Sequence, residues 1–77
     1  MSTLKVAISG ARGRMGKTLV ALAPEENARV LRELDMGDDL NGAAEGCDAV
    51  IDFSAHAATP LLAESCADAG IPLIIGT

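Results

Sequence analysis

Three glycines follow a short apolar run near the start of the chain, at a spacing that suits a phosphate-binding loop. Residues 10–18 read GARGRMGKT, so that Gly10, Gly13 and Gly16 recur at every third position. In a dinucleotide-binding turn the first glycine allows a tight turn, the second lets a pyrophosphate approach the backbone, and the third allows close packing of helix on strand. A helix that begins here also offers partial positive charge to an anion.

The end of the same segment matches part of a different loop, that of the nucleoside triphosphatases. That loop requires G-x-x-x-x-G-K-[ST], and Gly16, Lys17 and Thr18 fit its close. Ala11, however, stands where its first glycine is needed. Residues 49–52, AVID, imitate the acidic strand that holds magnesium in such enzymes, but an Asp is common at the end of any parallel strand. We therefore favour a dinucleotide site, with a triphosphatase fragment and a binding module without catalysis as alternatives.

A dinucleotide site also needs a carboxylate for the adenine ribose, about 20 residues past the loop at the end of the second strand. Asp35 lies at that distance, although Asp38 and Asp39 are close enough to compete and a solvated acidic turn is the alternative. A carboxylate binds both ribose hydroxyls of NADH but repels the 2′-phosphate of NADPH, whereas Arg12 can offset that repulsion. We expect NADH to bind as well as NADPH or up to about tenfold better.

The segments around the loop alternate between strand-like and helix-like patterns. Strands are expected at residues 4–9, 49–53 and 72–75, and the ambiguous segment 27–40 favours a second strand over a helix. Helices are expected from Met15 to Ala23 before Pro24, briefly over residues 39–45 before Gly46, and from Pro60 to Gly70. The expected helix faces are Met15, Leu19, Leu22 and Ala23 in the first helix, and Leu61, Leu62, Ser65, Cys66 and Ala69 in the last. The order β-α-β-α-β-α-β predicts an α/β fold, a Rossmann-like doubly wound parallel sheet that is incomplete at its C-terminus.

Composition limits the function further. Seventy-seven residues make one small domain, and Phe53 is its only aromatic residue, so the core must be aliphatic. A net charge of −5 argues against nucleic-acid and anionic-membrane partners. The chain has neither a secretory signal nor an apolar run of about 18 residues, which predicts a cytoplasmic protein. Cys47 and Cys66 are expected to be small buried hydrophobes, and no metal site is expected.

Three motifs together resemble those of one enzyme family. GARGRMG at residues 10–16, VIDFS at 50–54 and PLIIGT at 72–77 are similar to the start of 4-hydroxy-tetrahydrodipicolinate reductases, also called dihydrodipicolinate reductases. The resemblance implies that residues 1–77 form an N-terminal domain that binds NADH or NADPH. The implied cofactor-binding residues are Gly10, Ala11, Arg12, Gly13, Arg14 and Met15 at the pyrophosphate, Asp35 at the ribose, and Gly76 and Thr77 at the nicotinamide, with Phe53 and Ser54 flanking the cofactor.

The resemblance also implies an activity that this chain cannot complete by itself. Members of the family are NAD(P)H-dependent oxidoreductases of lysine and diaminopimelate biosynthesis that reduce 4-hydroxy-tetrahydrodipicolinate with loss of water. Their paired histidines and lysine lie in a later substrate-binding and tetramer-forming domain, so no catalytic residue is expected in this chain, which should be inactive and monomeric alone. His56 is expected on a surface turn and does not replace them. The chain also lacks the long insertion that many members carry after the second strand, between Asp35 and Asp38.

Overall fold

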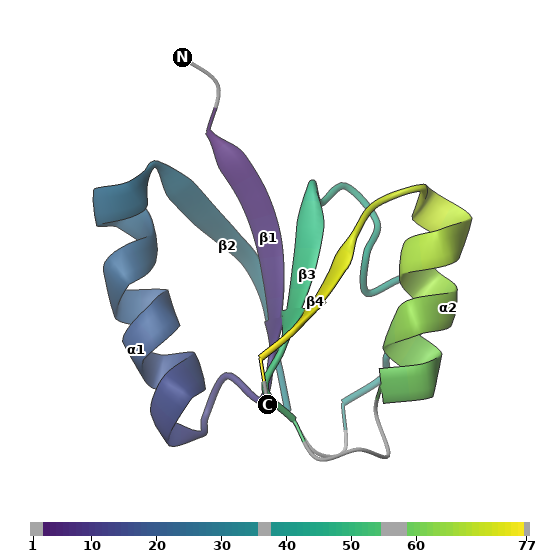
Figure 1. Ribbon diagram of the computed structural model, residues 1–77, viewed down its shortest axis with the longest axis horizontal. Coiled ribbons are helices and arrows are strands. Elements are labelled where there is room, and N and C mark those ends of the chain that lie inside the picture. Colours follow the sequence, from purple (N-terminus) through teal and green to yellow (C-terminus); the bar gives the residue numbers. More distant parts are fainter. Residues whose placement is uncertain (1–2, 36–37, 55–58, 77) are drawn as a thin grey trace.

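A computed structural model describes residues 3–35, 38–54 and 59–76. They form a four-stranded parallel sheet with one helix on each face (Figure 1). The strands are β1 (Leu4–Ser9), β2 (Ala28–Leu34), β3 (Ala49–Asp52) and β4 (Leu73–Ile75), in the spatial order β2-β1-β3-β4. This arrangement confirms the doubly wound parallel sheet and resolves the ambiguous second segment as a strand.

Strand β1 occupies the centre of the sheet because its sequence is apolar on both faces. Val6 and Ile8 pack toward one face, and Ala7 packs toward the other. Val6 pairs with Val30 of β2 and with Ala49 of β3. Strands buried on both sides in this way are typical of parallel sheets covered by helices.

The two helices cover opposite faces. Helix α1 (Arg14–Leu22) contributes Leu19 and Val20 to the cluster around Val6 and Ile8. It runs into a 3₁₀ turn, Ala23–Glu26, that contains Pro24 and ends at Asn27 in the left-handed region. Helix α2 (Thr59–Ala69) contributes Leu62 and Cys66 to the other cluster, and Gly70, with a φ of +70°, follows its end as expected.

The two cysteines are buried hydrophobes, as the sequence predicts. Cys47 and Cys66 both lie in the core under α2 and carry free thiols. Burial raises the pKa of the Cys66 thiol, and the neighbouring Cys47 raises it further. Both thiols therefore belong to the packing of the α2 face.

The predicted helix between the second and third strands is wrong. In the part of the chain that the structure describes, residues 41–46 form consecutive turns before β3. Gly42, inside the predicted range, has a φ of +68°, which a helix does not allow, and the Asp39 carboxylate accepts a hydrogen bond from the Asn41 amide. The guanidinium of Arg32 on β2 then donates to the carbonyls of Ala43 and Glu45. Local turn chemistry and this arginine therefore replace the helix.

Both predicted helix faces are partly wrong. Met15, Leu22 and Leu61 have exposed fractions of 56%, 44% and 55%, and Ala69 is exposed as well. The start of α1 instead packs through buried Gly16 on the backbone of the glycine loop, and the helix contacts β1 through Leu19 and Val20. The helical spacing alone did not reveal which face this contact would select.

Candidate functional site

The glycine loop lies where the winding of the sheet reverses. Strands β1 and β3 are neighbours in the sheet, but β1 continues toward α1 on one face and β3 toward α2 on the other (Figure 1). Ligands of open α/β sheets bind in the crevice outside the carboxyl ends of two such strands. The residues that follow β1 and β3 are therefore the first to consider as a binding site.

Gly10 and Gly16 are glycines for steric reasons. Gly10 has a φ of +81°, and a Cβ there would lie 2.8 Å from the carbonyl carbon of Phe53. A Cβ on Gly16 would overlap the carbonyl oxygen of Gly10, so helix α1 can come this close to the loop only through a glycine. The loop thus has the tight turn and the close helix packing expected of the first and third glycines.

The start of α1 is suited to an anion. Gly13 is its N-cap in an extended conformation, and a Cβ there would lie 3.3 Å from the Gly10 oxygen, its only neighbour within 4 Å. The Lys17 amide donates back to the Gly13 carbonyl at 2.9 Å, whereas helix geometry leaves the earlier first-turn amides without intrahelical acceptors. Arg12 and Arg14 are exposed on the same loop, and the first turn contains no acidic residue. Backbone donors and two exposed cations therefore gather at the start of α1.

The same loop does not suit a triphosphate. Its first two amides, those of Gly10 and Ala11, donate to the Leu34 carbonyl at 2.8 and 3.1 Å. A triphosphatase loop turns such amides toward the phosphates. Since these donors are already used to join the loop to β2, the geometry disfavours the triphosphatase alternative.

Of the three candidate ribose carboxylates, Asp35 is the one that contacts the loop. It is half-buried at the end of β2, and its Oδ2 accepts a hydrogen bond from the Arg12 amide at 2.8 Å. Asp38 accepts from the Asp35 amide, also at 2.8 Å, and Asp39 accepts from the Asn41 amide at 2.9 Å. Asp35 is therefore the carboxylate that flanks the anion position.

Gly76 lies beside the residues that follow β3. Its amide donates to the Asp52 carbonyl at 2.9 Å, and a Cβ on it would overlap the ring of Phe53. The structure thus brings Gly76 to the same edge of the sheet as the glycine loop. Thr77, predicted beside it, and His56 lie outside the described residues.

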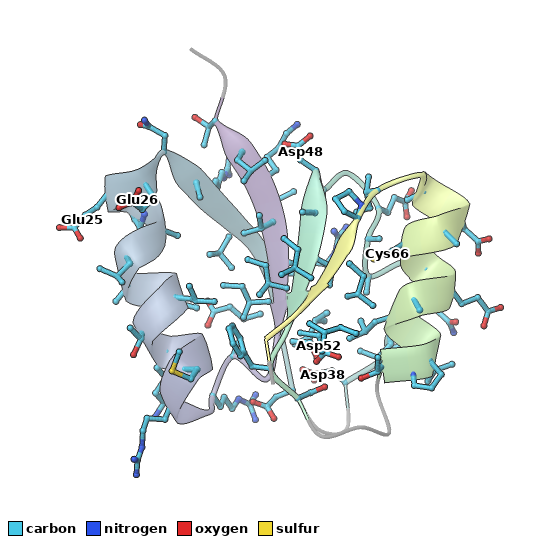
Figure 2. The ribbon with its side chains drawn as sticks, in the orientation of Figure 1. Glu25, Glu26, Asp38, Asp48, Asp52 and Cys66 are labelled. Carbon is cyan, nitrogen blue, oxygen red and sulfur yellow. The ribbon has the colours of Figure 1, made fainter. Side chains whose placement is uncertain are left out.

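Asp52 is a buried site residue to which the sequence analysis gave no role. It is 1% exposed at the end of β3, close to the start of α2 (Figure 2). Burial by itself raises the pKa of Asp52, but hydrogen bonds from the Ser54 hydroxyl and amide, Thr59 and Ser9 outweigh it, so that the pKa lies below the ordinary value of 3.8. No local sequence signal marks this role, because the donors come from three separate segments of the chain.

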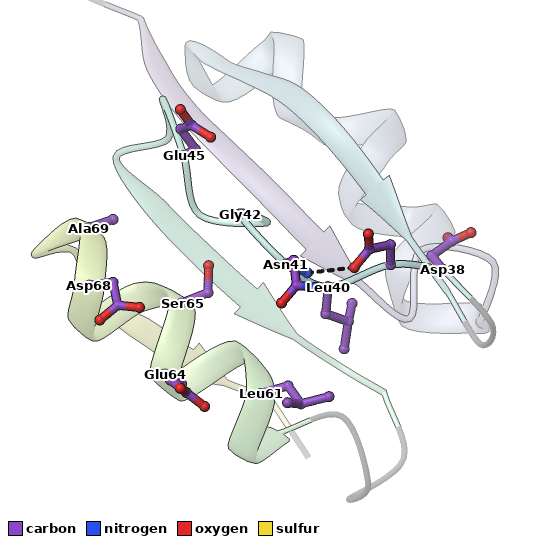
Figure 3. A pocket seen from close by; sticks show the side chains of 11 residues that line it. Asp38, Leu40, Asn41, Gly42, Glu45, Leu61, Glu64, Ser65, Asp68 and Ala69 are labelled. Atoms are coloured by element: carbon purple, nitrogen blue, oxygen red, sulfur yellow. Dashed lines mark hydrogen bonds between the residues drawn. The ribbon is translucent and has the colours of Figure 1, made fainter.

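A cavity of the described structure lies away from the glycine loop. It has a volume of about 590 Å³ and lies between α2 and the crossover that follows β2 (Figure 3). Its lining includes five carboxylates, those of Asp38, Asp39, Glu45, Glu64 and Asp68, and no residue of the described loop 10–16. Carboxylates of this number repel a pyrophosphate, so this cavity does not suit a dinucleotide.

Two further observations concern the described residues only. Among them, His, Cys, Asp and Glu side chains form no group of three or more that could hold a metal ion. None of the helices in residues 3–35, 38–54 and 59–76 is long and apolar enough to cross a membrane.

The fold is that of a nucleotide-binding domain of the Rossmann type. It combines a doubly wound parallel sheet with a three-glycine loop that opens a helix at the switch point, and a carboxylate is bonded to that loop. The comparison with known families is more specific. Residues 4–77 match the family model described as dihydrodipicolinate reductase, N-terminus, and the chain belongs to this family.

Curated relatives agree with this assignment. The chain is 37% identical over 76 residues to the 4-hydroxy-tetrahydrodipicolinate reductase of Beutenbergia cavernae, and 40% identical over 88 residues to that of Wolinella succinogenes. The matches cover 97% and 95% of this chain but 31% and 34% of the relatives. The chain therefore spans about a third of their length. The match to the Halorhodospira halophila enzyme extends over 99 residues, so that relative contains residues that this chain lacks.

Proposed function

We propose that this chain is the NAD(P)H-binding part of a 4-hydroxy-tetrahydrodipicolinate reductase. The observation that carries the proposal is the glycine loop bonded to Asp35: Gly10 and Gly16 leave no room for side chains, Gly13 leaves an open backbone, and Asp35 binds the Arg12 amide. The family of the chain and the printed names of its relatives support it. In the complete enzyme the domain 1–77 works with a second domain that binds the substrate and forms a homotetramer.

Different residues of the chain bind different parts of the cofactor. The amides at the start of α1, with Arg12 and Arg14, bind the pyrophosphate, and Asp35 binds the hydroxyls of the adenine ribose. Gly76 and Thr77 flank the nicotinamide. The bound dinucleotide supplies a hydride, which the complete enzyme transfers to the hydroxylated substrate or the unsaturated compound formed from it by loss of water.

The contacts of Asp35 support a modest preference for NADH. A carboxylate accepts hydrogen bonds from both ribose hydroxyls but repels a 2′-phosphate. The Arg12 side chain is exposed next to it and can offset part of that repulsion. NADH therefore binds as tightly as NADPH, or up to about tenfold more tightly.

A titration of the chain with NADH, NADPH and magnesium–ATP tests the proposal. Calorimetry and the fluorescence of the reduced nicotinamide follow binding independently. We expect saturable binding of both reduced dinucleotides and weaker or no binding of magnesium–ATP. Tighter binding of magnesium–ATP would favour a triphosphatase fragment, and binding of no nucleotide would favour an interaction module of the same fold.

A further inference from the structure

Asp52 is a buried carboxylate without a cation bonded to it in the described part of the chain. Its Oδ1 accepts hydrogen bonds from the Ser54 amide, at 2.8 Å, and from the Ser54 hydroxyl. Its Oδ2 accepts one from the Thr59 hydroxyl at 2.8 Å, and the Ser9 hydroxyl donates as well. Burial of a carboxylate costs several kcal/mol unless hydrogen bonds compensate it. Here the compensation comes from three segments of the chain, which Asp52 therefore joins: the end of β1, the turn after β3 and the start of α2.

The turn that Asp52 holds, Phe53–Ser54, lies between two glycines of the site. The carbonyl of Phe53 and the amide of Ser54 lie against Gly10, where a Cβ would come within 2.8 and 2.9 Å of them. The ring of Phe53 occupies the space that a Cβ on Gly76 would need. The turn therefore lies directly against Gly10 through its backbone and against Gly76 through the Phe53 ring.

The two glycines differ in what else holds them. The amide of Gly10 donates to the Leu34 carbonyl, and the loop is further joined to β2 through the Ala11 and Arg12 amides. For Gly76, the described contacts are with Asp52 and Phe53. The hydrogen bond from Gly76 to Asp52 continues the pairing of β3 with β4. A small shift of the turn should therefore move the Phe53 ring beside Gly76 and leave the glycine loop, fixed on the β2 side, nearly in place.

We infer that Asp52 is a positioning residue for the nicotinamide half of the cofactor: by binding Ser54 and Thr59 it fixes the turn against which Gly76 and the Phe53 ring are placed. The inference rests on the proposed function, because it takes Gly76 as a neighbour of the nicotinamide. Asp52 acts through the turn and does not touch the cofactor.

Two nearly isosteric variants test this role. Thr59→Val removes one hydroxyl donor of Asp52, and Asp52→Asn replaces one acceptor oxygen by an NH₂ group. For each variant, calorimetry measures the dissociation constants of NADH and of ADP-ribose, which contains the ribose and the pyrophosphate but no nicotinamide. The emission of bound NADH reports the surroundings of the nicotinamide ring.

We expect each variant to weaken NADH binding roughly tenfold, because the nicotinamide half loses contacts that ADP-ribose does not make. The dissociation constant of ADP-ribose should change by less than about threefold. The emission of bound NADH should shift toward that of the free cofactor. Thr59→Ser, which keeps the hydroxyl, should bind NADH as tightly as the unsubstituted chain and leave the emission of bound NADH unchanged.

Ser65→Ala is the matched control for loss of stability. Its hydroxyl also lies on α2 and accepts a hydrogen bond from the Ala44 amide at 3.1 Å, far along the helix from Thr59. It should lower the melting temperature without changing the NADH affinity. Equal losses of NADH and ADP-ribose affinity in the Asp52 and Thr59 variants, or no loss of either, would overturn the positioning role alone. Failure of the unsubstituted chain to bind both ligands would instead overturn the proposed function, and this inference with it.

Discussion

Gly13 and Gly16 lie in the same loop, but a side chain at each position should have a different effect. Gly16 faces the carbonyl of Gly10 so closely that a methyl group there must displace the backbone, whereas a methyl group on Gly13 would lie 3.3 Å from the nearest described atom, the Gly10 oxygen. Gly16→Ala should therefore destabilise the fold by at least about 2 kcal/mol. Gly13→Ala should change stability by less than about 1 kcal/mol, because its φ of −73° suits alanine.

At Gly13 a side chain should affect NADH binding strongly, although it should affect stability little. A methyl group at this N-cap lies where the pyrophosphate approaches the backbone, so Gly13→Ala should lose most of its NADH affinity while it remains folded. Denaturant unfolding and calorimetry on the same samples separate the two effects. If Gly13→Ala binds NADH as tightly as the unsubstituted chain, the pyrophosphate does not pass over Gly13.

Asp35 should discriminate between the two cofactors through its charge. The Arg12 amide donates to Asp35 at 2.8 Å. Asp35→Asn keeps an oxygen for this hydrogen bond but removes the charge that faces a 2′-phosphate. We expect NADH to weaken about tenfold, or 1.4 kcal/mol, and NADPH to be spared or improved. Asp38→Asn is the control, since Asp38 binds the Asp35 amide and not the loop. If the control changes the preference and Asp35→Asn does not, Asp38 is the ribose ligand.

At the scale of elements, the crossover between β2 and β3 depends on one arginine. The Arg32 guanidinium donates to the carbonyls of Ala43 and Glu45 and to the sulfur of Cys47, so it joins β2 to turns that have no helix to support them. Arg32→Met should lose these bonds and about 1–2 kcal/mol of stability. For a domain of this size the loss lowers the melting temperature by roughly 4–8 °C per kcal/mol.

Arg29 provides the matched control for that prediction. It is exposed on the same strand, and the structure describes no side-chain hydrogen bond for it. Arg29→Met should therefore leave the melting temperature nearly unchanged. Equal effects of the two substitutions would mean that the crossover is held by its own turns and not by Arg32.

The elements that the sequence predicted correctly are those whose signals are local. Strand β1 has the predicted bounds, and Gly70 ends α2 as predicted, because apolar runs and helix-ending glycines act on neighbouring residues. The missed features depend on distant partners. Nothing near residues 41–46 reveals that Arg32 will bind their carbonyls, and the helical spacing of Met15 and Leu22 does not reveal that both side chains will be exposed.

For the molecule as a whole, the topology could be predicted because alternating strands and helices allow few right-handed arrangements. The candidate site followed from the topology, since a glycine loop after the first strand must lie at the carboxyl edge of the sheet. The role of Asp52 could not be predicted. Its donors, Ser9, Ser54 and Thr59, come together only when β1, β3 and α2 are assembled.

The same assembly makes Asp52 a source of acid sensitivity for the whole fold. The pKa of Asp52 is lowered below its ordinary value of 3.8: burial opposes the charge, but the hydrogen bonds from Ser54, Thr59 and Ser9 favour it more strongly. A carboxylate whose pKa is lower in the folded than in the unfolded chain stabilises the fold at pH values above its pKa in the unfolded chain. That stability is lost as the pH falls through the folded value, when the native carboxylate must also accept a proton.

Urea unfolding at a series of pH values measures this contribution. Below about pH 5, as the pH falls through 3.8 and then through the lower folded pKa, the free energy of unfolding of the unsubstituted chain should fall. Asp52→Asn, which cannot titrate, should remove part of that slope. Glu33→Gln is the control, because Glu33 is exposed on β2 and the structure describes no hydrogen bond from its side chain. Equal slopes for the unsubstituted chain and Asp52→Asn would show that the proton affinity of Asp52 does not change on folding. The three hydroxyls would then hold the protonated and the charged acid equally well.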